Sequence, residues 1–199
     1  MRRSAIGLLV MLGTMVLFGI DCKKKEPEEV KQAPPQLMGQ APHSVGGGSS
    51  VAGIHWAVPG RWSELPPRQM RYATYNAPAA VGDPEGGECG VFFFGSGQGG
   101  SVDMNIDRWI GQFEDAGKPS RSVKEVNGLK VTFVEVRGTY VGMSGPMMPS
   151  QGKKENYRLL GAIVEAPEGS VFFKFTGPQK TVAAAEADFN ALTGSFARN

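Results

Sequence analysis

A cluster of glycines in this sequence imitates a nucleotide-binding motif. Gly95, Gly97 and Gly100 match the spacing G-x-G-x-x-G, after a predicted strand and before a predicted helix. In a dinucleotide site such glycines admit a pyrophosphate to the helix N-terminus, and an acid at the end of the next strand binds the ribose. Here the nearby acids, Glu114 and Asp115, end the helix, and the next strand belongs to a hairpin. The segment therefore predicts a connection of small residues, and no cofactor is expected.

The following segment imitates a calcium-binding loop, through Asp103, Asn105, Asp107 and Glu114. Such a loop needs a sharp turn at its sixth position, where Gly is usual and this chain has Arg108. The apolar pair Ile106 and Trp109 fits one face of a helix instead. Acidic residues in a first helical turn are expected from the helix dipole alone. We therefore expect no metal site here.

Covalent catalysis would depend on Cys89. A free Cys beside an apolar strand is commonly a small core residue. A nucleophilic thiol needs a base, and the predicted domain offers His55. Hydrolysis by two carboxylates is the other catalytic scheme, although no pair stands out among Glu88, Glu125, Glu135 and Glu165. A small envelope hydrolase stays open as an alternative, but no catalytic residue is assigned and an enzyme is the less favoured reading.

The Gly- and Pro-rich segment 138–153 holds Met143, Met147 and Met148 between two predicted strands. Loops of this length are uncommon unless they bind something or lack order. Methionine is an adaptable side chain, suited to surfaces that accept varied partners. These three residues mark the candidate interaction loop. The alternative interpretation is that their side chains fold back over one edge of the sheet and belong to the core.

The pattern of apolar residues predicts strands separated by two helices. We expect strands at 54–58, 68–75, 89–94, 122–126, 129–137, 157–166 and 171–175, with the 89–94 strand covered on both faces. Asn127-Gly128 predicts a tight hairpin turn. The helices are expected at 102–114 and 181–196, capped by Ser101 and Thr181. This order predicts the α+β class, with an antiparallel sheet of about six to seven strands packed with two main helices.

The N-terminus has the pattern of an export signal. Arg2 and Arg3 precede an apolar run of 16 residues, 5–20, which is shorter than the roughly 20 residues of a membrane span. Cys22, which follows this run after Asp21, resembles the lipid-attachment site of bacterial lipoproteins, and the alternatives are a signal anchor or ordinary cleavage nearby. We therefore expect an export signal at 1–21, a disordered tether at 22–52 and a single domain at 53–199.

The charge balance argues against binding to nucleic acid. The signal carries two Arg and one Asp, and the tether four Lys and three Glu, which leaves 15 basic and 15 acidic residues in 53–199. Proteins that bind nucleic acid need clustered Lys and Arg to displace counterions from phosphates. The expected partners are instead a membrane, through the lipid anchor, and an envelope protein.

Three segments resemble uncharacterised bacterial secreted or lipoprotein domains of the Mog1/PsbP-like fold: WAVPGRW at 56–62, NIDRWIGQF at 105–113 and FFKFTGP at 172–178. The resemblance covers roughly residues 54–198 and implies a sheet flanked by helices that serves in binding or assembly. It carries no catalytic residues. The sequence thus predicts a non-catalytic, exported envelope lipoprotein that presents a protein- or ligand-binding domain. A carrier of an apolar ligand, held between sheet and helix, is a further alternative.

Overall fold

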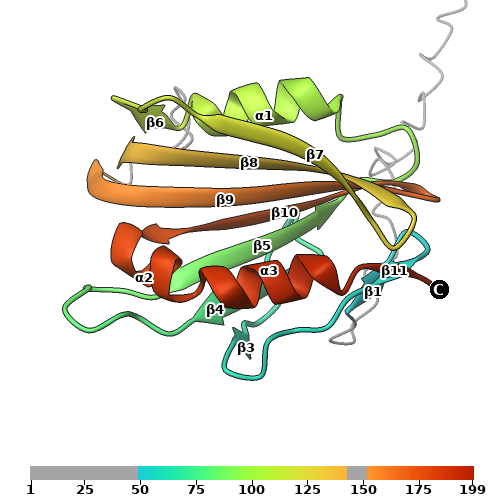
Figure 1. Cartoon of the computed structure of the whole chain (residues 1–199), viewed down its shortest axis with the longest axis horizontal. Coiled ribbons are helices and arrows are strands. Elements are labelled where there is room, and N and C mark those ends of the chain that lie inside the picture. Colours follow the sequence, from blue (N-terminus) through green and yellow to red (C-terminus); the bar gives the residue numbers. More distant parts are fainter. Residues whose placement is uncertain (1–48, 143–151) are drawn as a thin grey trace, which may run out of the picture. The chain divides into compact units, whose positions relative to one another are not determined.

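The computed structural model describes residues 49–142 and 152–199, and its centre is an antiparallel sheet of eight strands (Figure 1). The α+β antiparallel class is confirmed. From one edge to the other, the strands are β3 (Ser63–Glu64), β4 (Ala73–Ala77), β5 (Gly87–Phe93), β10 (Gly169–Pro178), β9 (Lys154–Ala166), β8 (Leu129–Tyr140) and β6 (Phe113–Glu114), with β7 (Ser120–Val126) also paired to β8. The sheet has more strands than the six to seven expected, because two-residue strands leave no periodic pattern in a sequence.

Helices cover both faces of this sheet. Alternate residues along each strand point to opposite faces, and cross-strand neighbours such as Cys89, Phe175 and Leu160 share one of them. That face packs against α2 (Gln179–Ala184) and α3 (Glu186–Gly194), through Val182, Phe189 and Leu192. The other face packs against α1 (Val102–Ile110), whose Ile106 and Trp109 contact residues that include Val134 and Ile163. Each face therefore has its own hydrophobic core.

A second, three-stranded sheet joins the start of the described domain to the end of the chain. It consists of β1 (Ser50–Val51), β2 (Ile54–His55) and β11 (Ala197–Arg198). Ser50 and Val51 were expected in the tether, which was predicted to run to residue 52. They form a strand because they pair with β2 in a short local hairpin, whose turn residues Ala52 and Gly53 both have positive φ angles.

The predicted hairpin around Asn127-Gly128 is confirmed. Asn127 and Gly128 have φ angles of 48° and 77°, the two positive values that a tight hairpin turn of this kind requires. The Asn127 amide also donates a 2.8 Å hydrogen bond to the backbone oxygen of Phe196. This turn therefore fixes the hairpin β7–β8 and also links it to the C-terminal segment.

Both helix predictions are right in place and wrong in extent. Ser101 caps α1 as expected, its Oγ accepting a hydrogen bond from the Met104 amide, but α1 ends at Ile110 instead of 114. Gly111 weakens helix propagation, and Phe113 then pairs in β6 with Tyr140.

The expected C-terminal helix 181–196 is two helices that meet at Ala185, which has φ −101° and ψ 6°. Thr181 is not a cap, because its hydroxyl lies inside α2 and bonds to the Asp83 carboxylate at 2.7 Å. The predicted apolar stripe is nevertheless buried throughout: Val182, Ala185, Phe189, Leu192 and Phe196.

The strand boundaries also differ from those expected. The strand predicted at 68–75 begins only at Ala73, because residues 68–71 form a turn in which Met70 has a φ of 64°. The segment 54–58 is extended only at Ile54–His55. On β5 the side chains of Glu88 and Phe92 on one face are only partly buried, and so is Phe93 on the other, so the expected coverage of both faces is incomplete. Within the described ranges, no helix has the length and apolar character to cross a membrane.

Candidate functional site

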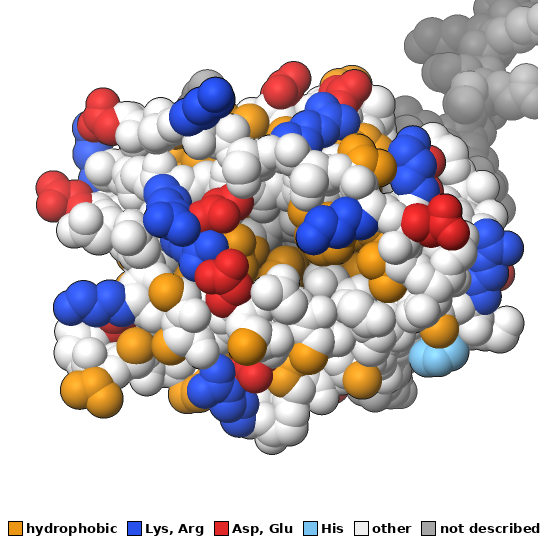
Figure 2. All heavy atoms as spheres, in the orientation of Figure 1, with side chains coloured by type: hydrophobic (Ala, Val, Ile, Leu, Met, Phe, Trp, Pro, Cys, Tyr) orange, Lys and Arg blue, Asp and Glu red, His pale blue; other side chains and the backbone are white. Residues whose placement is uncertain are grey.

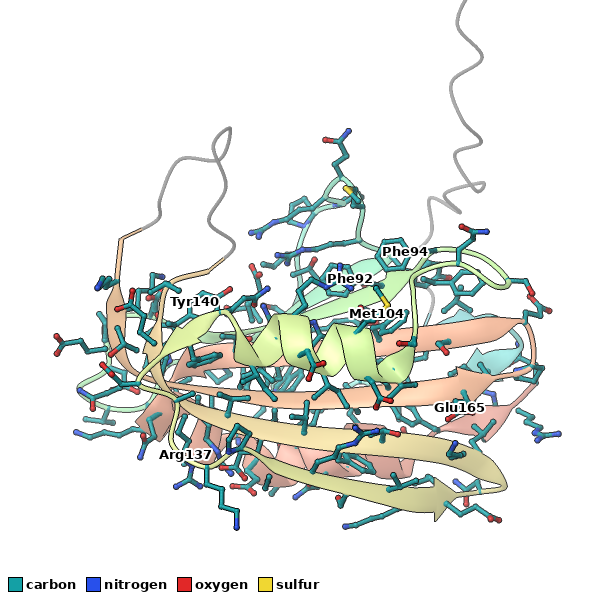
Figure 3. The ribbon with its side chains drawn as sticks, turned by 90° about the horizontal axis from the view of Figure 1, so that it is seen from above. Phe92, Phe94, Met104, Arg137, Tyr140 and Glu165 are labelled. Atoms are coloured by element: carbon teal, nitrogen blue, oxygen red, sulfur yellow. The ribbon has the colours of Figure 1, made fainter. Side chains whose placement is uncertain are left out.

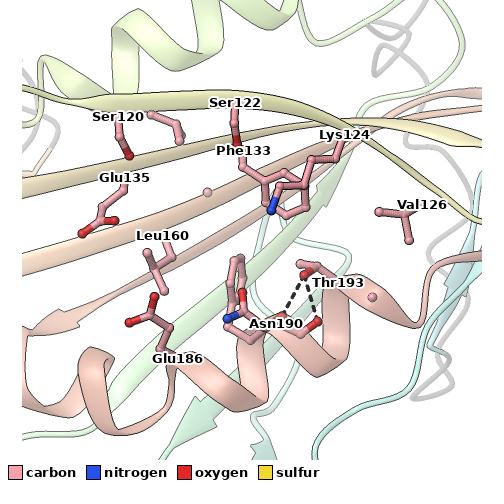
Figure 4. Close-up of a pocket in the computed structure, with 14 residues that line it drawn as sticks. Ser120, Ser122, Lys124, Val126, Phe133, Glu135, Leu160, Glu186, Asn190 and Thr193 are labelled. Carbon is pink, nitrogen blue, oxygen red and sulfur yellow. Dashed lines mark hydrogen bonds between the residues drawn. The ribbon is translucent and has the colours of Figure 1, made fainter.

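A groove lies between α3 and the hairpin β7–β8, on the sheet face that carries α2 and α3 (Figure 4). It has a volume of about 380 Å³ and is open to solvent on the face shown in Figure 2. Its lining residues are Ser120, Ser122, Lys124 and Val126 on β7; Phe133, Val134 and Glu135 on β8; Leu160 and Gly161 on β9; and Glu186, Phe189, Asn190, Thr193 and Gly194 around α3. The groove is therefore formed by elements that lie far apart in the sequence.

The alternation of β7 and β8 explains the mixed character of the lining. Alternate residues of β7, among them Ser122 and Lys124, face the groove, while Arg121 on the opposite face pairs with Asp103 of α1. On β8, Phe133 provides the apolar floor beside Leu160 of β9. The result is an apolar floor with a polar wall of hydroxyls and one ammonium group.

An ion-pair network occupies one end of the groove. Arg158, only 3% exposed, bonds with Nε to Glu135 at 2.8 Å and with Nη1 to Glu186 at 2.7 Å. Burial alone would raise the pKa of Glu135, but hydrogen bonds from Arg158 and Arg137 outweigh it and hold that pKa below its ordinary range. Both groove carboxylates, Glu135 and Glu186, are therefore already partnered by Arg158.

Lys124 lines the groove away from this ion-pair network, beside the ring of Phe133. Its Nζ lies 5.6 Å from the centre of the Phe133 ring, a cation–π contact. Across the part of the chain that the structure describes, Lys124 forms no ion pair. The groove therefore offers a positive charge next to an apolar surface.

The α1 face holds a second cluster of charged residues, around Lys174 of β10. The Lys174 ammonium donates to the Gln112 side-chain oxygen and, at 3.3 Å, to the Tyr140 hydroxyl. Burial, together with the nearby charge of Arg71, lowers the pKa of Lys174 to about 8, and the charge of Glu88 partly opposes this shift. Arg71 is held 2.6 Å from Glu88. The neighbouring aromatic and methionine side chains, Phe92, Phe94 and Met104, gather on this face (Figure 3).

The candidate nucleophile Cys89 and the candidate base His55 are not brought together by the fold. Cys89 is fully buried in the core, where burial raises its thiol pKa far above the ordinary value. His55 lies exposed in the small sheet and its Nδ1 contacts the Asn199 oxygen at 3.1 Å. Nothing in the described residues therefore supports a Cys89–His55 pair.

The glycine segment and the calcium-like segment have structural roles. Gly95, Gly97, Gly99 and Gly100 all have positive φ, and β5 before them has antiparallel neighbours on both sides, so no β–α–β unit is formed. Asn105, from the calcium-like pattern, is buried in α1, and its amide donates to the Gly99 and Ser101 oxygens at 2.8 Å. It holds the glycine connection against the helix.

Two predicted sites, Cys22 and the Met143, Met147 and Met148 loop, lie outside the described residues. The loop is shorter than the segment 138–153 named from the sequence, because β8 continues to Tyr140 and β9 starts at Lys154. Its interaction role and the lipidation of Cys22 remain predictions. The groove itself was missed, although the alternation of residues 120–126 could have shown which side of that strand bears Lys124.

Comparison with known proteins adds a distant likeness. No family model and no curated protein matches the chain. The solution structure of cyanobacterial PsbP (CyanoP) from Synechocystis sp. PCC 6803 is similar to it, with 11% identity and a TM-score of 0.47 over 77% of this chain and 96% of that one. This agrees with the PsbP-like resemblance seen in the sequence. A likeness this distant carries no conclusion about function, and the architecture described above rests on the chain's own strand pairings.

Proposed function

We propose that this chain is an exported, lipid-anchored, non-catalytic protein that binds a segment of a partner protein in the groove between α3 and the β7–β8 hairpin. One observation carries the proposal: Lys124 has no ion pair among the described residues and lies on the apolar ring of Phe133, whereas the groove carboxylates Glu135 and Glu186 are both held by Arg158. Lys124 can therefore attract an acidic group of a partner, while the charges of Glu135 and Glu186 are balanced by Arg158 and repel that group less.

The shape of the groove favours an extended chain segment over a small enclosed ligand. Its volume of about 380 Å³ lies in the range of ligand sites, but it is open to solvent along the surface (Figure 2). An apolar side chain of the partner would lie against Phe133 and Leu160, and a neighbouring carboxylate would face Lys124. Such charge complementarity mainly sets specificity and the rate of association. The carrier alternative needs an enclosed, dry cavity, whereas this groove is open to solvent.

The hydrolase alternative has less support. A general acid at neutral pH needs a raised pKa, produced by burial or a neighbouring negative charge. Glu135 instead has a lowered pKa, because Arg158 and Arg137 donate to it. The candidate nucleophile Cys89 is buried, and burial raises the pKa of its thiol. These groups are arranged to stabilise the fold more than to react.

Site-specific photo-crosslinking in the source cells tests the proposal. A benzophenone side chain replaces Asn190, an exposed groove residue, and the matched control position is Met104, which is 66% exposed on the α1 face. We expect a discrete protein adduct from position 190 only. In the same background, Lys124→Glu should remove the adduct and Lys124→Arg should keep it, with circular dichroism melts unchanged.

Two results would overturn the proposal. One is an adduct at position 190 that forms equally well with Lys124→Glu, since the ammonium group would then have no part in recognition. The other is equal labelling from positions 190 and 104, which would show random contact and no binding groove.

A further inference from the structure

The outer edge of β7 (Ser120–Val126) is the long open edge of the main sheet. β7 pairs with β8 on one side, and no strand in the described ranges pairs with it on the other. Six of its seven residues are exposed and the seventh is partly buried. Figure 3 shows β7 at the outside of the sheet. The opposite edge is β3, which has only two residues. A seven-residue edge without proline is a template for a further strand.

The charges along β7 match those of a second copy of β7 running antiparallel to it. In a two-fold arrangement around Val123, the strand SRSVKEV pairs with itself along its whole length. This register places Arg121 opposite Glu125 of the other copy, twice, and Val123 opposite Val123. Cross-strand pairs of opposite charge and of apolar residues both stabilise a sheet.

Other registers of the same strand are worse. Residues that face each other across an antiparallel pair have their side chains on the same face of the sheet. With a two-fold axis perpendicular to the sheet, this requires the axis to pass through a residue position of β7 and not between two residues. A centre at Lys124 would place two lysines opposite each other, and a centre at Ser122 would place Arg121 opposite Val123 and leave two residues of each strand unpaired. The register centred on Val123 therefore pairs the most residues and has the most favourable charges.

The side chains that such pairing would use are available. Val123 is 54% exposed, one of the few large apolar side chains at the surface. Arg121 forms an ion pair with Asp103 at 2.6 Å, yet its side chain remains 47% exposed. Both lie on the α1 side of β7, because Ser122 and Lys124 face the groove.

We infer that two copies of this chain associate edge to edge through β7, with Val123 on the two-fold axis and Arg121–Glu125 pairs on either side. The two eight-stranded sheets become continuous, and Lys124 of each copy lies beside Ser122 of the other at the rims of the two grooves. Because the contact is a single strand pair, the association is expected to be weak and sensitive to salt.

Charge reversal tests this pairing in the full chain, purified in detergent micelles and followed by sedimentation velocity over a concentration series at low salt. Arg121→Glu places Glu opposite Glu125, and Glu125→Arg places Arg opposite Arg121. Each single variant should lower the association constant at least about tenfold. An equimolar mixture of the two variants should form heterodimers, and the double variant should dimerise like the wild type, because both restore opposite charges.

The control is Lys180→Glu, a reversal at an exposed position of α2, which should leave association unchanged. Melting curves of every variant establish that the fold is intact. Wild-type protein that stays monomeric at all concentrations would overturn the inference and leave the edge to another partner or to none. Single variants that dimerise as well as the wild type would also overturn it.

Discussion

Lys174 shows how strongly the fold can change the chemistry of one residue. It lies on β10 between Gly90 of β5 and Gly161 of β9 in the strand register, so its long side chain can lie across the sheet. There it reaches Gln112 and Tyr140, and its Nζ is 5.2 Å from the Tyr140 ring centre. The cost of removing the ammonium group from water lowers its pKa to about 8.

This lowered pKa predicts a pH dependence of stability. Between about pH 8 and the ordinary lysine value of roughly 10.4, the unfolded chain binds the proton that the folded chain has lost, so Lys174 makes the protein more stable as pH rises. Lys174→Met removes this titration. The difference in free energy of unfolding, variant minus wild type, should therefore fall by about 2–3 kcal/mol from pH 7 to pH 10. Urea unfolding at several pH values measures it.

The matched control for this prediction is Lys180→Met. Lys180 is exposed on α2, and its variant should have a stability profile parallel to that of the wild type. If the profile of Lys174→Met were also parallel, Lys174 would titrate as an ordinary exposed lysine and its burial would have no electrostatic cost.

At the scale of elements, the packing of α1 on the sheet depends on a glycine, Gly161, whose lack of a side chain leaves room for the helix. Gly161 lies on β9 directly beneath Trp109 of α1. A Cβ atom at position 161 would come within 2.5 Å of Trp109 Cζ3 and 2.7 Å of Val134 Cγ1. The glycine therefore lets the indole ring approach the backbone of β9 closely, which sets the distance between helix and sheet.

Gly161→Ala should destabilise the protein by about 1–3 kcal/mol, as overpacking in cores does. In the background Trp109→Leu the same substitution should cost much less, because the clashing ring is absent, so the two effects should not add. Chemical denaturation of the four proteins in this cycle measures the coupling. Gly117→Ala is the control, since no atom lies within 4 Å of a Cβ there. Strict additivity would contradict the contact.

At the scale of the whole molecule, we expect the predicted export signal and tether to decide where the domain works. The domain residues 53–199 have balanced charge, so we expect membrane association to come from Cys22 and not from a basic surface. The substitution Cys22→Ser should move the protein from the membrane fraction to the soluble fraction of the cell envelope. It should also remove the lipid mass from the mature N-terminus in mass spectrometry.

Cys89→Ser is the control for this experiment, because Cys89 is the free cysteine of the described domain and is buried. That variant should fractionate like the wild type and keep the lipid mass. Retention of Cys22→Ser in the membrane fraction would point to a signal anchor, the alternative left open by the sequence, and would contradict lipid anchoring.

Local patterns in the sequence were enough for the class of the fold and for several of its parts. The Asn127-Gly128 turn and the Ser101 cap depend on contacts within a few residues, and both are present. The apolar spacing of the C-terminal segment likewise predicted which of its side chains are buried. The sequence also argued against a calcium loop, because Arg108 occupies the position where a sharp turn needs Gly. It argued against a nucleotide site, because the strand after α1 belongs to a hairpin.

Only the tertiary structure decided what lies between these parts. The groove joins β7 and β8 to α3, which begins about fifty residues after the hairpin ends, and the ion pairs of Arg158 join β9 to β8 and to the start of α3. The pairing of β2 with β11, which completes the small sheet, likewise joins residues that are distant in sequence. Local spacing determines which face a side chain occupies on its own element, but which faces meet depends on how the whole chain buries its apolar surface.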